Sequence, residues 1–479
     1  MAIIKKKTWA YLLLTASITL SAFAGHTQLF AGIIAYALIY CAIRSFQTYE
    51  TYKKRVYFFL VLLFFIFAGI GMSGIQLLPG IELIFHSARS SHVPEFFYNN
   101  LLIKPVQIVL YFVPDLFGNP ANKNYLIPFS YPSKAIYVGL TAIFFVVLSF
   151  FIKSKGLFFK AVAVSTILVS LIVFLNPVSY LFYKLDLPLI SSSSPSNFIF
   201  MVSLGLCLLA GFGIDELQKH RSIKPIVVII SFWIIFCGIF IITSMLRTPI
   251  VNRNLIYSFL VLFALTVTVF IYQVSKKTAY IAGLLFICIA LIDLFYFFHK
   301  FNSFVPTSYI YPKTEIEKWL NKNTGIDRFW GYSYGNIEAN FATQLGLYSP
   351  EGYDPLYSKE YGELIQSSNN GAIPKKFNER SRSDALIPNG FGKTDMTENP
   401  YRLKILSLLG VKYILDKTEN GSTLETFPVN LFEKVLSIDD FHVLEYKKAT
   451  PRFFLTNSYQ LFSNKDDFTK KLFNPNFDP

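Results

Sequence analysis

Three acidic residues in the first 298 residues are placed where a carboxylate could act on a bound molecule. Glu82 and Asp115 follow an apolar stretch that ends near residue 79, and Asp293 lies inside a later apolar stretch. A carboxylate can accept a proton from a hydroxyl group, which makes Glu82 and Asp115 candidate catalytic bases and Asp293 a candidate binding residue. Each also has an ordinary explanation, as an acid at a membrane surface or, for Asp293, as a contact between helices. An acid inside a membrane is costly and needs a partner.

Other polar residues near these acids suit anion binding. A guanidinium group can form two parallel hydrogen bonds to a phosphate, so Arg89 is the preferred candidate, although a contact with lipid headgroups would also explain it. His26 and Gln28 lie in a tight turn, either as capping side chains or as a pair of donors that faces a site. No cluster of His and Cys residues indicates a metal site, and the sequence does not decide whether a divalent cation is used as a cofactor.

Composition divides the chain into an apolar, basic part and a neutral part. The 479 residues are 53% apolar and 15% charged, against roughly 25% charged in soluble domains. Residues 1–298 hold 22 Lys/Arg and 8 Asp/Glu, whereas residues 299–479 hold 22 of each. The excess cations lie in short runs between apolar stretches, which argues against nucleic-acid binding, and the 50 Phe residues argue against disorder. We predict a polytopic α-helical membrane bundle over 1–298, followed by an α/β domain over 299–479.

Nine apolar segments are long enough, or nearly so, to cross ~30 Å of hydrocarbon. The second is the shortest, with 16 residues. The predicted spans are 8–24, 29–44, 56–79, 135–152, 159–175, 197–213, 225–245, 254–274 and 279–298.

Basic residues occur at every second junction between these segments. They gather at 5–7, 44–55, 153–160, 219–224 and 276–277. Because short basic loops stay in the cytoplasm, the N-terminus is predicted to be cytoplasmic and the C-terminal domain extracytoplasmic. The loop 80–134 is then external, and its apolar stretch 101–116, interrupted by Pro105 and Pro114, suits a re-entrant or interfacial segment that covers a cavity.

The C-terminal part has the pattern of a mixed α/β domain. A capping box at Thr314 and Glu317 predicts a helix start, and 401–409 predicts a second helix with Gly410 as its C-cap. Strands are predicted at 411–415, 441–446 and 452–459, and a last helix at 466–473. Because the chain stops soon after that helix, we expect a domain that is truncated at its C-terminus.

Two aromatic, Gly-rich segments, 329–334 and 351–357, are predicted to be loops. They either pack the domain or form a sugar-binding face, since aromatic rings offer flat apolar area with a polar rim.

Short motifs across nearly the whole chain resemble, in the same order, those of the YfhO-type bacterial membrane proteins. Asn197 stands where that family tends to have Arg, and Thr27 where it has Pro. The motifs are Ala24-Gly25-His26-Thr27-Gln28; 76–83, with Ser87 and Arg89; Pro114-Asp115-Leu116-Phe117-Gly118; Pro195-Ser196-Asn197-Phe198; 210–215; Asp293-Leu294 with Phe301-Asn302; Gly352-Tyr353-Asp354-Pro355-Leu356; 408–415; and Phe477-Asp478-Pro479.

The resemblance implies a GT-C-like glycosyltransferase. Such an enzyme takes a sugar from a polyprenyl-phosphate donor and transfers it, outside the membrane, to an envelope glycopolymer such as lipoteichoic acid. Glu82 and Asp115 would then be the catalytic carboxylates. The substrates would be bound by His26, Gln28, Arg89, Asp293 and Asp354.

The same resemblance implies that an N-terminal half is missing. Family members have additional spans there, with an acidic first external loop, so we expect a fragment whose N-terminal half is separately encoded. A transporter or flippase of a lipid-linked sugar is an alternative. A non-catalytic scaffold of envelope assembly is another, because the expected catalytic loop is absent.

Overall fold

The computed structural model describes residues 8–90, 100–127, 131–152, 156–185, 195–219, 222–246, 249–301, 304–311, 313–378, 381–390 and 392–477. These residues form two compact units. The first unit is made by residues up to Leu78 together with Pro94–Ser303. The second is made by Pro79–Val93 together with Phe304–Pro479. The short segment 79–93 therefore belongs with the C-terminal part of the chain, whereas the predicted boundary was a single point near residue 298.

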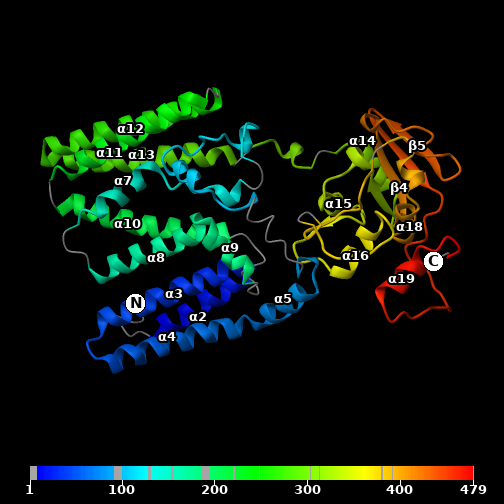
Figure 1. Cartoon of the computed structure of the whole chain (residues 1–479), viewed down its shortest axis with the longest axis horizontal. Coiled ribbons are helices and arrows are strands. Elements are labelled where there is room, and N and C mark those ends of the chain that lie inside the picture. The colour runs from blue at the N-terminus through cyan, green and yellow to red at the C-terminus, as the bar shows by residue number, and fades with distance from the viewer. Residues whose placement is uncertain are drawn as a thin grey trace. The chain divides into compact units, whose positions relative to one another are not determined.

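The first unit is a bundle of apolar helices (Figure 1). In the described part of the chain, seven helices are long and apolar enough to cross a membrane, which makes the chain a multi-pass membrane protein. They are α3 (Thr27–Thr48), α4 (Tyr52–Met72), α8 (Leu157–Phe174), α10 (Ile199–Lys219), α11 (Lys224–Leu246), α12 (Pro249–Val274) and α13 (Lys276–Phe298).

Two further apolar helices are shorter than these seven; the first matches the predicted span 8–24, and the second is shorter than predicted. α2 (Thr8–Phe23) has 16 residues, and α7 (Leu140–Ser149) has 10, so α7 extends only ~15 Å at ~1.5 Å per residue. The predicted span 135–152 is therefore wrong in length, because residues 135–139 are not helical and lead into α7 through Gly139 at φ +92°. The third predicted span also ends early. α4 stops at Met72, and α5 (Gly74–His86) continues the chain from the first unit into the second.

Packing in the bundle follows the apolar pattern. α2 and α3 both pack on α4, α7 packs on α10, and α12 packs on α13. Buried Phe144 on α7 and Phe232 and Phe236 on α11 lie in the large core formed by α7, α8 and α10–α13. α9 (Asn176–Lys184) is a short helix that follows α8.

The apolar stretch 101–116 joins this core instead of forming a span. Pro105–Tyr111 form the 3₁₀ helix η2, and Ile103, Val113 and Leu116 are buried in the core of the bundle. Protein thus covers this irregular backbone. The loop goes on through two more 3₁₀ helices, η3 (Pro120–Asn122) and η4 (Pro132–Lys134).

The second unit contains a mixed four-stranded sheet in the order β1-β4-β6-β5. β1 (Arg328–Gly331) runs parallel to β4 (Val411–Lys417), while β6 (Phe441–Tyr446) pairs antiparallel with both β4 and β5 (Phe432–Ile438). β2 (Gly352–Tyr353) pairs with β3 (Asp384–Ala385) in a separate small sheet. The helices of this unit are α14 (Glu315–Asn323), α15 (Phe341–Gln344), α16 (Lys359–Ser367), α17 (Asp395–Glu398), α18 (Pro400–Leu408) and α19 (Lys465–Leu472).

Both faces of the four-stranded sheet are buried. Neighbouring residues on a strand point to opposite faces. Trp330, Ile414 and Leu444 lie in one hydrophobic cluster, and Phe329, Leu415 and Val443 lie in another. The segment 329–334 therefore supplies a core strand, and its buried Phe329, Trp330 and Tyr332 do not form a sugar-binding surface.

Several predicted elements of the second unit are present and one is wrong. Thr314 caps α14 by accepting a hydrogen bond from the Glu317 N–H at 3.2 Å, and Gly410 at φ +64° follows α18. Residues 452–459, predicted as a strand, form no strand, and Phe453, Leu455 and Tyr459 are exposed. β1 and β5 are the two edges of the four-stranded sheet, and residues 452–459 pair with neither of them.

Candidate functional site

Asp115 is held by three separate segments at one end of the first unit. Its buried carboxylate forms an ion pair with Lys300, which lies in the 3₁₀ helix η6 (His299–Phe301) just after α13. Asn119 donates to the other carboxylate oxygen at 3.1 Å. The Asn254 side chain, near the start of α12, donates to the backbone carbonyl of Asp115. A carboxylate fixed in this way is positioned by the fold, as a reacting group has to be.

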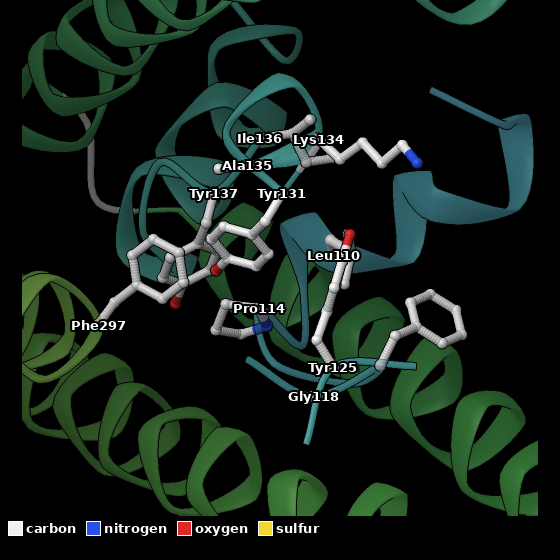
Figure 2. Close-up of a pocket in the computed structure, with 11 residues that line it drawn as sticks. Leu110, Pro114, Gly118, Tyr125, Tyr131, Lys134, Ala135, Ile136, Tyr137 and Phe297 are labelled. Carbon is white, nitrogen blue, oxygen red and sulfur yellow. The ribbon is translucent and has the colours of Figure 1, made fainter. Parts of the chain in front are cut away.

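Tyrosine and phenylalanine rings pack against one another in the same part of the first unit. The Tyr131 hydroxyl accepts a hydrogen bond from Asn119 at 3.4 Å, and its ring stacks on Phe301 at 5.3 Å between centroids. Tyr137 packs edge-on against Phe297, also at 5.3 Å. Figure 2 shows the rings of Tyr131, Tyr137 and Phe297 around a cavity of about 10 Å³, which has room for about one water molecule.

Burial near Asp115 changes the proton affinity of the loop side chains. Burial raises the pKa of Tyr125 to about 12, and burial together with the Asp115 charge raises the pKa of Tyr131 further. Burial, and then the nearby Lys104, lower the pKa of the Lys134 ammonium group. Both tyrosines therefore remain neutral hydrogen-bonding groups at neutral pH.

Asp293, on α13, is fully buried and caps the start of α7. One of its oxygens, Oδ2, accepts from the Tyr137 hydroxyl at 2.5 Å and from the Leu140 N–H at 3.0 Å. Leu140 is the first residue of α7, so Asp293 supplies from another helix the acceptor that an N-cap normally provides. The other oxygen, Oδ1, accepts no hydrogen bond from any residue that the structure describes. A contact between helices therefore explains the position of Oδ2, but it gives Oδ1 no hydrogen-bond donor among the described residues.

A larger cavity of about 250 Å³ lies beside Asp115, between α12 and α13. We call it the α12–α13 groove. The rings of Tyr257 and Tyr296 stack in it at 3.8 Å, and the Lys300 ammonium group lies 4.2 Å from the Tyr296 ring centroid. Arg253, Ile256 and Leu260 also line it and are exposed on α12. The groove thus joins a charged end to an apolar surface of a membrane-spanning helix.

His26 and Gln28 lie in the same unit but have different roles in the turn before α3. The exposed His26 caps α3, with its Nδ1 accepting from the Leu29 N–H at 3.4 Å. Gln28 is buried and accepts a hydrogen bond from Asn197 at 2.9 Å. Asn197 belongs to the 3₁₀ helix η5 (Pro195–Phe198), which contacts η4, the segment that carries Lys134. Motifs that are distant in the sequence therefore meet in the first unit.

The other three predicted site residues belong to the second unit. Glu82 is an exposed residue of α5. Arg89 lies in the 3₁₀ helix η1 (Ala88–Ser90), and its backbone carbonyl accepts from the buried Arg382 at 3.4 Å. Asp354 is exposed, and its Oδ1 accepts from the Leu356 N–H at 2.8 Å in a local turn. Asp115 and Asp293 are thus the predicted acids that the fold brings to one end of the bundle.

Sequence reasoning missed the partners that hold the acids. Lys300 and Tyr137 lie just outside the end of an apolar helix, and Asn254 lies in the second turn of α12. The spacing of Tyr296 and Lys300, four residues apart at the end of the last span, was the available signal, because such residues share one helix face.

No three His, Cys, Asp or Glu residues lie close enough to hold a metal ion in the part of the chain that the structure describes. No protein-family model, curated protein or solved structure matches the chain. The chemistry of the site therefore has to be argued from the residues themselves.

Proposed function

We propose that this membrane protein is a GT-C-type glycosyltransferase of the YfhO kind, or the C-terminal part of one. It transfers a sugar from a polyprenyl-phosphate carrier to an envelope glycopolymer, such as lipoteichoic acid, at the outer face of a bacterial membrane. One observation carries the proposal. A buried, positioned carboxylate, Asp115, lines a groove whose other wall is the apolar surface of a membrane-spanning helix.

The reaction has requirements that this site can meet. An acceptor hydroxyl oxygen attacks the anomeric carbon, the bond from that carbon to the phosphate oxygen breaks, and the phosphate leaves with the bonding electrons. Asp115 takes the hydroxyl proton. Lys300, beside Asp115, is the proposed cation for the negative charge that develops on the phosphate. Arg89, in the second unit, keeps the phosphate-binding role that the resemblance implies.

The remaining predicted residues complete the proposal. Glu82 is the second candidate base, and Asp354 is assigned to the acceptor sugar. Asp293 and Gln28, with His26, support the site from the helices. In the proposed orientation the N-terminus is cytoplasmic and the second unit is extracytoplasmic; the basic flanks 5–7 and 153–155 that support it lie outside the described residues.

Transfer of radiolabelled sugar from a polyprenyl-phosphate carrier, in vesicles that contain the protein, tests this function. Two preparations are compared, the chain alone and the chain together with the N-terminal spans of a YfhO-type protein. Transfer by either preparation supports the proposal. Absence of transfer from both, with a folded protein and a panel of sugar donors, contradicts it.

A flippase for a lipid-linked sugar is the second candidate. Its specific support is the 10-residue helix α7, which is entered by non-helical backbone and capped by the buried Asp293. Broken helices with buried polar groups are typical of secondary transporters. Movement of a labelled carrier lipid across the bilayer without sugar transfer would favour this function.

A further inference from the structure

The α12–α13 groove has a charged mouth with one uncompensated positive charge. Asp115 and Lys300 neutralise each other in their ion pair. Arg253 is exposed on the same cavity and forms no hydrogen bond or ion pair with the residues that the structure describes. Three charged groups therefore leave a net charge of about +1 at the mouth, which suits an anion, and guanidinium matches phosphate well.

Below the mouth the groove becomes apolar and faces outward from the helix. Ile256 and Leu260 are each 62% exposed although they lie on a helix long and apolar enough to span a membrane. They are four residues apart, so they follow Arg253 down approximately one face of α12. In a bilayer this face meets hydrocarbon chains, and a lipid chain can lie along it without leaving the membrane.

The volume shows which part of a lipid can enter. The groove holds about 250 Å³, somewhat less than the ~300–1,000 Å³ of pockets that enclose a drug-sized molecule. It can receive a phosphate and the first part of a chain, while the rest of the chain runs along Ile256 and Leu260. The stacked rings of Tyr257 and Tyr296 form an apolar lining at the point where headgroup and chain join.

We infer that the α12–α13 groove is the binding site of the polyprenyl-phosphate carrier, with Arg253 as its phosphate ligand. This inference rests on the proposed function and names the surface through which the donor reaches Asp115 from the lipid. Arg253 is thereby a substrate-binding residue, distinct from Arg89 in the second unit.

Photocrosslinking in vesicles tests the inference. A polyprenyl monophosphate with a photoreactive group in its first isoprene units is incorporated with the full chain, and adducts are mapped by mass spectrometry. Adducts are expected on α12 and α13 near Arg253, Ile256 and Tyr296. Arg253→Gln should lower labelling about tenfold or more, the change expected for loss of a hydrogen bond to a charged group. Lys277→Gln, at the start of α13, should leave it unchanged.

Further variants keep the test decisive. Leu260→Trp fills the apolar wall and should lower labelling even if Arg253→Gln fails to fold. Adducts that map to other helices, or labelling that both variants leave unchanged, would overturn the inference. Equal competition by phosphatidylglycerol would also overturn it, because the groove would then bind bulk phospholipid.

The same vesicles separate this inference from the proposed function. Sugar transfer with crosslinks on other helices would support the proposed function and contradict the assignment of the α12–α13 groove as the carrier site. Crosslinks at Arg253 without any sugar transfer would support the carrier-lipid site and contradict the proposed glycosyltransferase activity.

Discussion

At the residue scale, the ion pair between Asp115 and Lys300 predicts two separable effects of Asp115→Asn. Sugar transfer should fall by about 10²–10⁴-fold, the usual contribution of a catalytic base. The protein should also lose stability, on the order of 3 kcal/mol, because Lys300 is left buried without its counter-charge.

A double variant, Asp115→Asn with Lys300→Met, removes both charges and should recover most of the stability without recovering transfer. Thermal unfolding in detergent and the vesicle assay measure the two effects. Normal transfer by a folded double variant would exclude Asp115 as the base.

Arg89→Ala should lower sugar transfer without loss of folding. One contact of Arg89, the hydrogen bond from buried Arg382, uses the Arg89 backbone carbonyl, which the substitution retains. Thermal stability and transfer rate are measured together, with Lys376→Ala, an exposed cation of the same unit, as control. Equal transfer by the two variants would exclude a role of Arg89 in sugar transfer.

At the element scale, α7 depends on an acid from another helix for its first turn. Asp293→Asn keeps an acceptor and should destabilise the protein by about 1 kcal/mol. Asp293→Leu leaves the Leu140 N–H and the Tyr137 hydroxyl without this acceptor and should cost about 2–5 kcal/mol. Thermal unfolding in detergent checks the order, with Asp215→Leu, an exposed acid on α10, as control. Equal stability of wild type and Asp293→Leu would show that the cap is dispensable.

The strand β6 makes the second unit sensitive to alkaline pH. Burial raises the pKa of Tyr446 to about 12, from an ordinary value of 10. The folded state therefore holds this proton more tightly than the unfolded state, and the stability it contributes is present below pH 10 and lost as pH rises towards 12.

Tyr446→Phe should accordingly reduce the fall in unfolding free energy between pH 9 and pH 11, by on the order of 1 kcal/mol. Tyr334→Phe, a change at an exposed tyrosine, should not. Chemical unfolding of the detergent-solubilised protein at several pH values measures both. An identical pH profile for the two variants would contradict the prediction.

Element existence could largely be predicted from the sequence, and element length less well. Long apolar segments predict seven helices correctly, because a run of ~20 apolar residues is the length that a helix needs to cross a membrane. α7 could not be foreseen as a ten-residue helix, because Asp293, more than 140 residues later, determines where it starts. Likewise the sequence of β1 has the composition of an aromatic loop, and the segment becomes a core strand because it pairs with β4.

The candidate site could be predicted in part for the same reason. Asp115 and Asp293 stand out as acids near apolar segments. Their partners, Lys300 and Tyr137, are ordinary residues until the fold brings them into contact with the acids. A single sequence carries no signal for such contacts beyond local spacing.

At the scale of the whole molecule, the alternation of basic connections predicts that the second unit is outside the cell. In a variant without native cysteines, Lys376→Cys in the second unit should react with an impermeant thiol reagent on whole cells. Lys54→Cys, in the first turn of α4, should react only after the membrane is opened. Both positions are exposed in the protein, so access depends on the membrane alone. The reverse labelling would invert the orientation.

The second unit is assembled from two pieces of chain that are far apart. Ser87 pairs with Ser358, and the Ala88 N–H donates to the Tyr357 carbonyl at 3.0 Å, so segment 79–93 is an integral part of that unit. During synthesis this segment emerges first and must wait while the helices between residues 94 and 303 are inserted. The second unit therefore completes its folding only after the helices of the first unit have been synthesised. A protein made from residues 304–479 alone would lack segment 79–93, which is part of the same unit.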